Sequence, residues 1–177
     1  MLKLLKWVLI GLVGLAVVLF AGGYALSPKF SVARTTTVAA PADKLYGLIA
    51  DPREWKRWTV WNQRDPSMQI SYSGPASGAG AGWAWKSVSE GDGKMTFTSA
   101  EPNRRLAYEL FFPDFGTTST GALSLAPEGA ATKVTWSMDG DMGSNPLFRW
   151  MALFGDRMVG PDFEAGLANL KALAEKP

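Results

Sequence analysis

The hydrophobic positions along the chain fall into three successive patterns. Residues 7–26, WVLIGLVGLAVVLFAGGYAL, form one apolar run without a charged side chain. Residues 30–139 then read mainly as short segments typical of strands, and the part after Pro146 returns to helical spacing. At about 1.5 Å per residue, a helix over residues 7–26 is long enough to cross the roughly 30 Å hydrocarbon core of a bilayer.

The residues around the apolar run favour a membrane span with a defined orientation. Trp7 and Tyr24 lie near its two ends, where amphipathic rings prefer the membrane interface. Lys3 and Lys6 precede it, which favours a cytoplasmic N-terminus and a domain outside, in the bacterial periplasm or an equivalent compartment. We therefore expect a single-pass membrane protein that enters the lipid bilayer through residues 7–26.

This interpretation divides the chain into an anchor, residues 1–28, and a soluble domain, residues 29–177. A cleaved signal peptide is the alternative, because Gly23-Tyr24-Ala25 has the small-x-small form of a cleavage site. The apolar run is longer than the usual 7–15-residue core of a signal peptide, which favours the anchor.

The soluble part is predicted to contain a strand, two helices, six strands and a long helix. Pro41 and Asp43 open the first helix, since proline suits a first turn and a carboxylate suits the positive end of the helix dipole. The final helix begins near Pro146 and is expected to kink around Gly160-Pro161. This order indicates an α+β protein whose sheet has about seven antiparallel strands. The strands are expected over residues 30–38, 68–73, 83–89, 95–101, 105–112, 117–126 and 133–139.

Composition excludes several kinds of chemistry. The chain has no cysteine and no histidine, so thiol nucleophiles, disulfides, imidazole or thiolate metal sites and Ser-His-acid triads are absent. Without Lys3 and Lys6, the 18 basic residues become 16, which equals the 16 acidic ones. A neutral domain lacks the basic surface that nucleic acid requires, so we expect no nucleic-acid partner.

Four segments of the soluble part resemble the SRPBCC superfamily, which includes START and Bet v 1-like domains, and within it the polyketide cyclase/dehydrase-like group. They are VAAPADKLYGLIADPREWKRWTVW, YSGPASGAGAGWAW, KVTWSMDGDM and VGPDFEAGLANLKALAE, and the resemblance covers roughly residues 30–175. It implies a helix-grip fold, in which a curved antiparallel sheet surrounds the C-terminal helix. It also implies an internal cavity for lipids, sterols, polyketides or other apolar molecules. We expect no metal and no cofactor.

Strand parity predicts which side chains face that cavity. Alternate residues of a strand share one face, and aromatic and methionine side chains suit an adaptable apolar site. The alternative is that the same side chains fill a closed core. The predicted cavity residues are Trp83, Trp85, Met95, Phe97, Tyr108, Leu110, Phe112, Trp136 and Met138 from the strands, and Met151, Met158 and Phe163 from the helix.

Four further residues are candidates for the mouth of the cavity. Trp55, Trp58 and Trp61 mark the second predicted helix and the loop after it. They are candidates for a lid at the cavity mouth or for a membrane-facing aromatic patch near the anchor, and the alternative is that they only pack in the core. Asp114 lies in a turn near the rim. No spacing singles out a general acid or base, so no catalytic residue is assigned.

The leading hypothesis is a non-catalytic, membrane-anchored domain that binds or carries an apolar small molecule. One alternative is a cyclase- or hydrolase-type enzyme that uses Tyr108 or Asp114 with water. The other is an interaction module with a closed core and no ligand.

Overall fold

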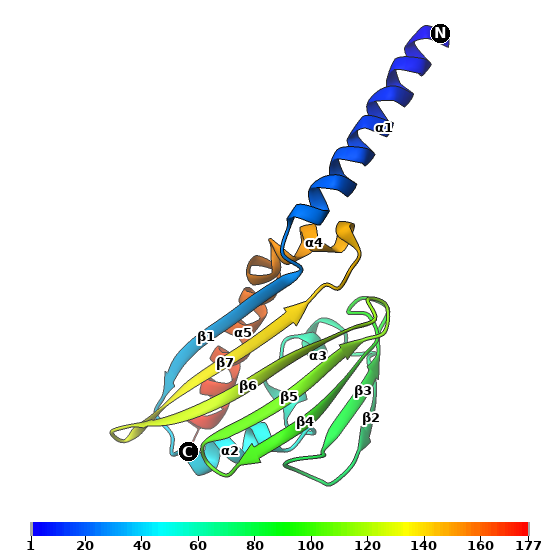
Figure 1. Ribbon diagram of the computed structural model, residues 1–177. Helices are drawn as coiled ribbons and strands as arrows, with labels where there is room; N and C mark the ends of the chain where they lie inside the picture. The colour runs from blue at the N-terminus through cyan, green and yellow to red at the C-terminus, as the bar shows by residue number, and fades with distance from the viewer. Residues whose placement is uncertain (1, 177) are drawn as a thin grey trace.

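The apolar run at the N-terminus forms helix α1, Leu2–Ala25, which projects from the rest of the protein (Figure 1). The structure is a computed structural model that describes residues 2–176. Among these residues, α1 is the one helix that is long and apolar enough to cross a membrane. The side chains of residues 3–21 are exposed, so α1 is not a core helix of the domain.

A short connection leads from α1 into strand β1, Lys29–Val38. Helix α2, Ala42–Ala50, follows and buries Leu45 and Ile49. The tryptophan-rich segment was predicted to form one helix, but the structure divides it into a 3-10 turn, η1 (Trp55–Arg57), and a short helix, α3 (Trp61–Arg64).

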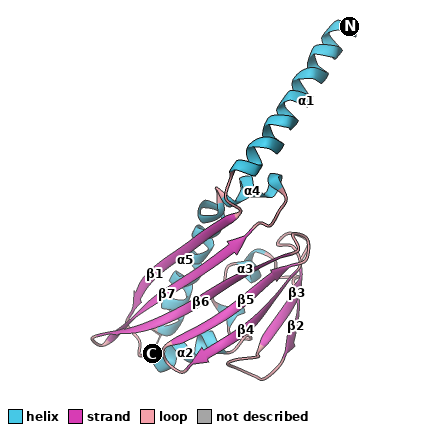
Figure 2. Ribbon diagram, in the orientation of Figure 1, coloured by secondary structure: helices cyan, strands magenta, loops and turns pink. Residues whose placement is uncertain are grey.

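The remaining strands form an antiparallel meander that ends beside β1 (Figure 2). The order across the sheet is β1-β7-β6-β5-β4-β3-β2, so the first and last strands of the chain are neighbours. The predicted α+β class, the strand number and the curved sheet around a long C-terminal helix are confirmed. The strands are β2 (Gln69–Ser73), β3 (Gly82–Lys86), β4 (Gly93–Glu101), β5 (Arg105–Phe112), β6 (Thr117–Glu128) and β7 (Ala131–Asp141).

The C-terminal helical region differs from the prediction in where it is interrupted. It consists of α4, Pro146–Ala152, and α5, Gly155–Ala174, so the break falls before Gly155 and Pro161 lies inside α5. Because α4 packs against α1 whereas α5 packs against β1, the chain changes direction between them. Pro161 is tolerated because it and Arg157, whose carbonyl loses its usual helical partner, are both exposed to water.

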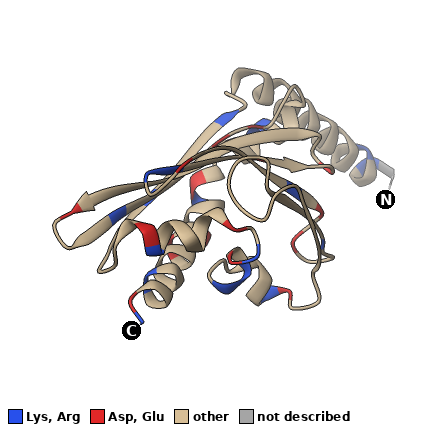
Figure 3. Ribbon diagram, turned by 90° about the horizontal axis from the view of Figure 1, so that it is seen from below, with Lys and Arg blue, Asp and Glu red and all other residues tan. Residues whose placement is uncertain are grey.

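Helix α5 is held on the sheet by an arginine from β1. Arg34 donates to Asp156, at 2.7 Å, and to Glu164, at 2.5 Å. Its guanidinium lies against Gly160, where a Cβ would displace it from its present position. The hydrogen bond from Arg34 holds the pKa of Asp156 below its ordinary value. Acidic and basic residues are interspersed over the helical layer (Figure 3).

Candidate functional site

A cluster of aromatic rings fills most of the space between the sheet and α5. Trp55, from η1, is its centre, and five rings lie within 4.7–5.9 Å of it, those of Trp58, Trp83, Phe97, Tyr108 and Trp136. Trp136 also stacks face to face on Phe163 of α5, with centroids 3.9 Å apart. This part of the interior is therefore closed by packing.

The polar atoms of Trp55, Tyr108 and Trp136 are satisfied within the protein. Trp136 Nε1 donates to the Tyr108 hydroxyl at 2.8 Å, and that hydroxyl donates to the Ser137 carbonyl at 3.3 Å. Trp55 Nε1 donates to the Ile49 carbonyl at 2.8 Å. Burial raises the pKa of Tyr108 above its ordinary value. The Tyr108 hydroxyl is neutral and fully buried, and it both accepts and donates a hydrogen bond within the protein. It is therefore a structural group of the core.

An apolar cavity of about 100 Å³ remains beyond this cluster, under α3 and the strands β3, β4 and β5. Six of the predicted cavity and lid residues line it, and four lining residues were not predicted. The six are Trp61, Trp83, Trp85, Met95, Leu110 and Phe112; the four are Thr59, Asn62, Met68 and Glu90.

The other predicted residues lie elsewhere. Five of them are buried in the core and do not line the cavity: Phe97, Tyr108, Trp136, Met138 and Phe163. Trp55 packs against the rings of Phe97, Tyr108 and Trp136, and Phe163 stacks on Trp136. Trp55 and Trp58 are themselves fully buried and therefore do not form an exposed lid. Met151 and Met158 lie in α4 and the first turn of α5, and Met158 is 56% exposed. Asp114 lies in the exposed turn between β5 and β6.

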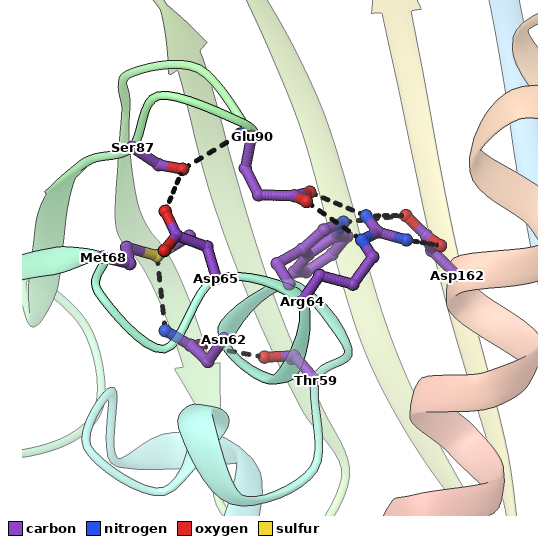
Figure 4. Close-up of polar contacts among 9 residues, drawn as sticks. Thr59, Asn62, Arg64, Asp65, Met68, Ser87, Glu90 and Asp162 are labelled. Carbon is purple, nitrogen blue, oxygen red and sulfur yellow. Dashed lines mark hydrogen bonds and ion pairs between the residues drawn. The ribbon is translucent and has the colours of Figure 1, made fainter.

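The cavity is bordered by an ion-pair cluster that we call the Arg64 clasp, formed by Arg64, Glu90 and Asp162 (Figure 4). Arg64 Nε and Nη2 donate to Glu90 at 3.0 and 2.7 Å, and Nη1 and Nη2 donate to Asp162 at 2.6 and 2.8 Å. Trp61 Nε1 also donates to Asp162, at 2.8 Å. The clasp thus joins α3, the β3–β4 loop and α5, three elements that are distant in the sequence.

A second set of hydrogen bonds fixes the β3–β4 loop. Ser87 Oγ donates to Asp65 at 2.6 Å and accepts from the Glu90 amide at 2.9 Å (Figure 4). Hydrogen bonds from Ser67 and Ser87 lower the pKa of Asp65 below its ordinary value. Glu90 is therefore positioned from both its backbone and its side chain.

The lining chemistry suits an apolar molecule with few polar groups. Thr59 Oγ1 donates to the Trp55 carbonyl at 2.9 Å, and Asn62 Nδ2 contacts Met68 Sδ at 3.3 Å. The Glu90 carboxylate is occupied by Arg64. Within residues 2–176, no cluster of three or more acidic side chains is arranged to hold a metal ion.

Aromatic rings continue from the cavity towards α4. Trp85 and Phe112 lie 6.0 Å apart, Phe112 and Phe115 lie 6.4 Å apart, and Phe115 and Phe148 lie 5.6 Å apart, each pair edge to face. The first two rings of this series line the cavity, and the last belongs to α4. The cavity wall and the base of α1 are thus connected by one apolar series.

An antiparallel sheet that curves around one long helix, with an apolar cavity at one end, defines the SRPBCC class of domains. Within this class, the sequence profile of the family described as "Polyketide cyclase / dehydrase and lipid transport" matches residues 29–175, and the chain belongs to that family.

Solved structures share the fold at low sequence identity. The protein CV1439 from Chromobacterium violaceum is 15% identical, with a TM-score of 0.60, over 83% of this chain and 98% of its own. A protein from Thermobifida fusca is 20% identical, with a TM-score of 0.61, over 80% and 90%. CalU16 from Micromonospora echinospora is 20% identical, with a TM-score of 0.56, over 83% and 77%. No curated protein matches the sequence significantly.

Proposed function

We propose that this protein binds an apolar small molecule, such as a lipid or a polyketide-like compound, in the cavity beside the Arg64 clasp, without catalysing its conversion. The observation that carries the proposal is the cavity wall itself, which combines Trp83, Trp85, Met95, Leu110 and Phe112 with very few polar atoms. Such walls are typical of sites for hydrophobic ligands. The description of the family, which includes lipid transport, supports the same ligand class.

The volume of the cavity limits the size of the ligand that fits while the Arg64 clasp is closed. Pockets for drug-sized ligands usually measure roughly 300–1,000 Å³, whereas this cavity has about 100 Å³. The closed form therefore has room for one ring or a short acyl segment. A larger ligand requires the β3–β4 loop to move away from α3 and α5, which means opening the Arg64 clasp.

We further propose that residues 1–28 remain attached as a membrane anchor, with the N-terminus in the cytoplasm and residues 29–177 outside. Supporting this, α4 packs across the position where a signal peptide would be cut. A Cβ at Gly22 would press on the Trp150 ring, and one at Gly23 would clash with Pro146. Contacts of this kind fit a segment that stays with the domain. An anchored cavity also meets lipophilic molecules at a higher local concentration than water provides.

The ligand proposal is tested on the full chain in lipid nanodiscs, with extraction under denaturing conditions and mass spectrometry of the bound molecules. The decisive variant is Leu110→Trp, because Leu110 lines the cavity and the larger ring would fill it. Leu110→Met is the matched control, since its volume is nearly unchanged. The lipids around α1 are common to all three samples, so only a cavity ligand differs between them.

We expect one apolar compound near one molecule per chain in the wild type and in Leu110→Met, and its loss in Leu110→Trp. A wild type that carries nothing beyond the nanodisc lipids, and that also takes up none of a panel of fluorescent lipids, would contradict ligand binding. That result would favour the closed interaction module, which the packed cluster around Trp55 would then explain.

A further inference from the structure

Helix α4, which packs against α1, and the residues that follow it carry apolar side chains that the domain leaves uncovered. Four of them lie on α4, on the connection after it and on the first turn of α5. Their exposed fractions are 47% for Leu147, 56% for Leu153, 48% for Phe154 and 56% for Met158. We call these four residues the α4–α5 elbow. Apart from residues of α1, they are among the few large apolar side chains of the described chain that are strongly exposed.

Helix α4, which carries Leu147 of the elbow, is attached directly to the membrane-length helix. Trp150 Nε1 donates to the Leu19 carbonyl of α1 at 2.9 Å. Arg149 Nη1 lies 3.3 Å from the Tyr24 carbonyl and 3.4 Å from the Leu26 carbonyl, at the end of α1. These contacts fix α4 beside the last turns of α1, as Figure 1 shows.

The contact with Leu19 sets how deep α4 would lie in a bilayer. At about 1.5 Å per residue, the Leu19 carbonyl lies roughly 9 Å before the end of α1 at Ala25. Helices that lie in a membrane interface bury their apolar faces by about 5–10 Å. If α1 spans the bilayer, α4 therefore reaches the depth of an interfacial helix, and the start of α5 follows it directly in the chain.

The residues around the elbow are of the types that are enriched at a membrane interface. Tyr24 and Trp150 are amphipathic aromatics, which are enriched at membrane interfaces. Arg149 packs over the Tyr24 ring, 5.7 Å from its centroid, so its charged head and apolar stem meet both environments. An exposed cluster of this kind would be a liability in water, whereas a bilayer would cover it.

We propose that the α4–α5 elbow is a second membrane-contacting surface, which lies in the outer interface of the bilayer around the base of α1. This inference rests on the proposed anchor and adds a defined orientation to it. With the elbow in the lipid, Phe148 of α4 lies close to the bilayer, and the series Phe115, Phe112, Trp85 leads from Phe148 to the cavity. An apolar ligand would then have a nonpolar surface to follow from the membrane to the cavity.

The test uses the absence of cysteine in the chain, which makes one introduced cysteine a unique labelling site. Phe154→Cys and Met158→Cys report on the elbow, Leu12→Cys on the middle of α1, and Glu101→Cys on the exposed end of β4, at the end of the sheet away from α1 (Figure 1). Each full-length variant is labelled with an environment-sensitive fluorophore and reconstituted into vesicles of phosphatidylcholine and phosphatidylglycerol. Lipids spin-labelled at the headgroup or along the acyl chain then quench each fluorophore according to its depth.

We expect the elbow labels to lose most of their emission to the headgroup-region quencher, the Leu12 label to lose its emission to the deep quencher, and the Glu101 label to be unaffected. If the Leu12 label is quenched while both elbow labels behave like Glu101, the elbow inference is wrong and the anchor stands. If the Leu12 label is not quenched, the anchor is wrong, and the elbow inference falls with it. All four positions are exposed, so the variants are expected to fold, which a thermal unfolding curve for each one checks.

Discussion

The two ends of the space between sheet and helices are closed in different ways. Towards α5, Trp136 stacks on Phe163, and Trp55 fills the volume beside them, with all indole and phenol groups hydrogen-bonded inside the protein. Towards α3, a cavity remains, and its border is an arginine between two carboxylates. The first closure is dry and aromatic, whereas the second is polar and partly exposed.

This difference indicates where the interior opens at low cost. Separating the aromatic cluster would expose several large rings to water, each of which contributes a few kcal/mol when fully buried. Opening the Arg64 clasp breaks ion pairs in which the arginine side chain is 46% exposed, whereas the side chains of Glu90 and Asp162 are only 15% and 19% exposed. Such pairs are worth more than fully exposed ones, which contribute about 0–1 kcal/mol each, but the charges regain hydration when the clasp opens. Ligand entry is therefore expected at the clasp, with the aromatic cluster as the rigid part of the domain.

The strongest test of the rigid end is Trp136→Ala. Loss of this ring removes the stack on Phe163 and the edge contacts to Trp55 and Trp58, so we expect the free energy of unfolding to fall by about 3–5 kcal/mol. Trp85→Ala, in the half-buried wall of the cavity, is the comparison and should cost clearly less. Chemical denaturation of both variants measures the two losses, and equal losses would contradict the distinction between the ends.

A smaller effect is expected for Tyr108→Phe. The substitution keeps the ring but removes the acceptor of Trp136 Nε1, which leaves a buried donor without a partner. Such a loss typically costs about 1–3 kcal/mol. Ligand occupancy should be unchanged, because Tyr108 does not line the cavity. A variant that is fully stable but no longer binds ligand would assign Tyr108 to the site and support the catalytic alternative.

A pair of arginine variants tests whether the clasp controls access of the ligand to the cavity. Arg64→Met should lower stability by about 1–2 kcal/mol, because two largely buried carboxylates lose their partner. It should also speed the exchange of a bound fluorescent lipid, because Glu90 and α5 lose their link to α3. Arg34→Met is the matched control, since Arg34 also joins two carboxylates but lies away from the cavity. Stopped-flow displacement measures both rates. Equal rates in the two variants would show that the clasp does not control access.

The smallest expected effect is a change in how stability depends on pH. The pKa of Asp65 is lowered in the folded state by Ser67 and Ser87, so its contribution to stability is complete above the unfolded value of about 3.9 and is lost as the pH falls through the folded value. Asp65→Asn should therefore be less stable than the wild type at neutral pH and should lose less stability between neutral pH and strongly acidic pH. Thermal unfolding across this range measures both curves, and parallel curves would contradict the assignment.

The sequence predicts the fold well because its turns and periodicity are local properties. Strand β5 has the predicted bounds, and the other strands are close to theirs. The break before Gly155 was missed because it depends on α4 meeting α1, a contact between distant segments, whereas Pro161 gave a stronger local indication of a kink.

The site is only partly predictable for a similar reason. Strand parity correctly places Trp83, Met95 and Leu110 on the inner face, but it does not show which of the inner residues Trp55 covers. Glu90 and Asp162 carry no motif that links them to Arg64, since their meeting depends on how the β3–β4 loop and α5 come together. Side chains that close a cavity from loops are visible only in three dimensions.

The most direct test of ligand binding in the cavity is photolabelling of the full chain in lipid nanodiscs with a diazirine-bearing fatty acid, followed by peptide mass spectrometry. We expect labels on cavity residues such as Met68, Met95 and Leu110, and we expect these labels to be lost in Leu110→Trp. Labels on α1 are expected in both proteins, because the surrounding bilayer also contains the probe. Labels confined to α1 and the α4–α5 elbow, with none in the cavity of the wild type, would contradict ligand binding in the interior.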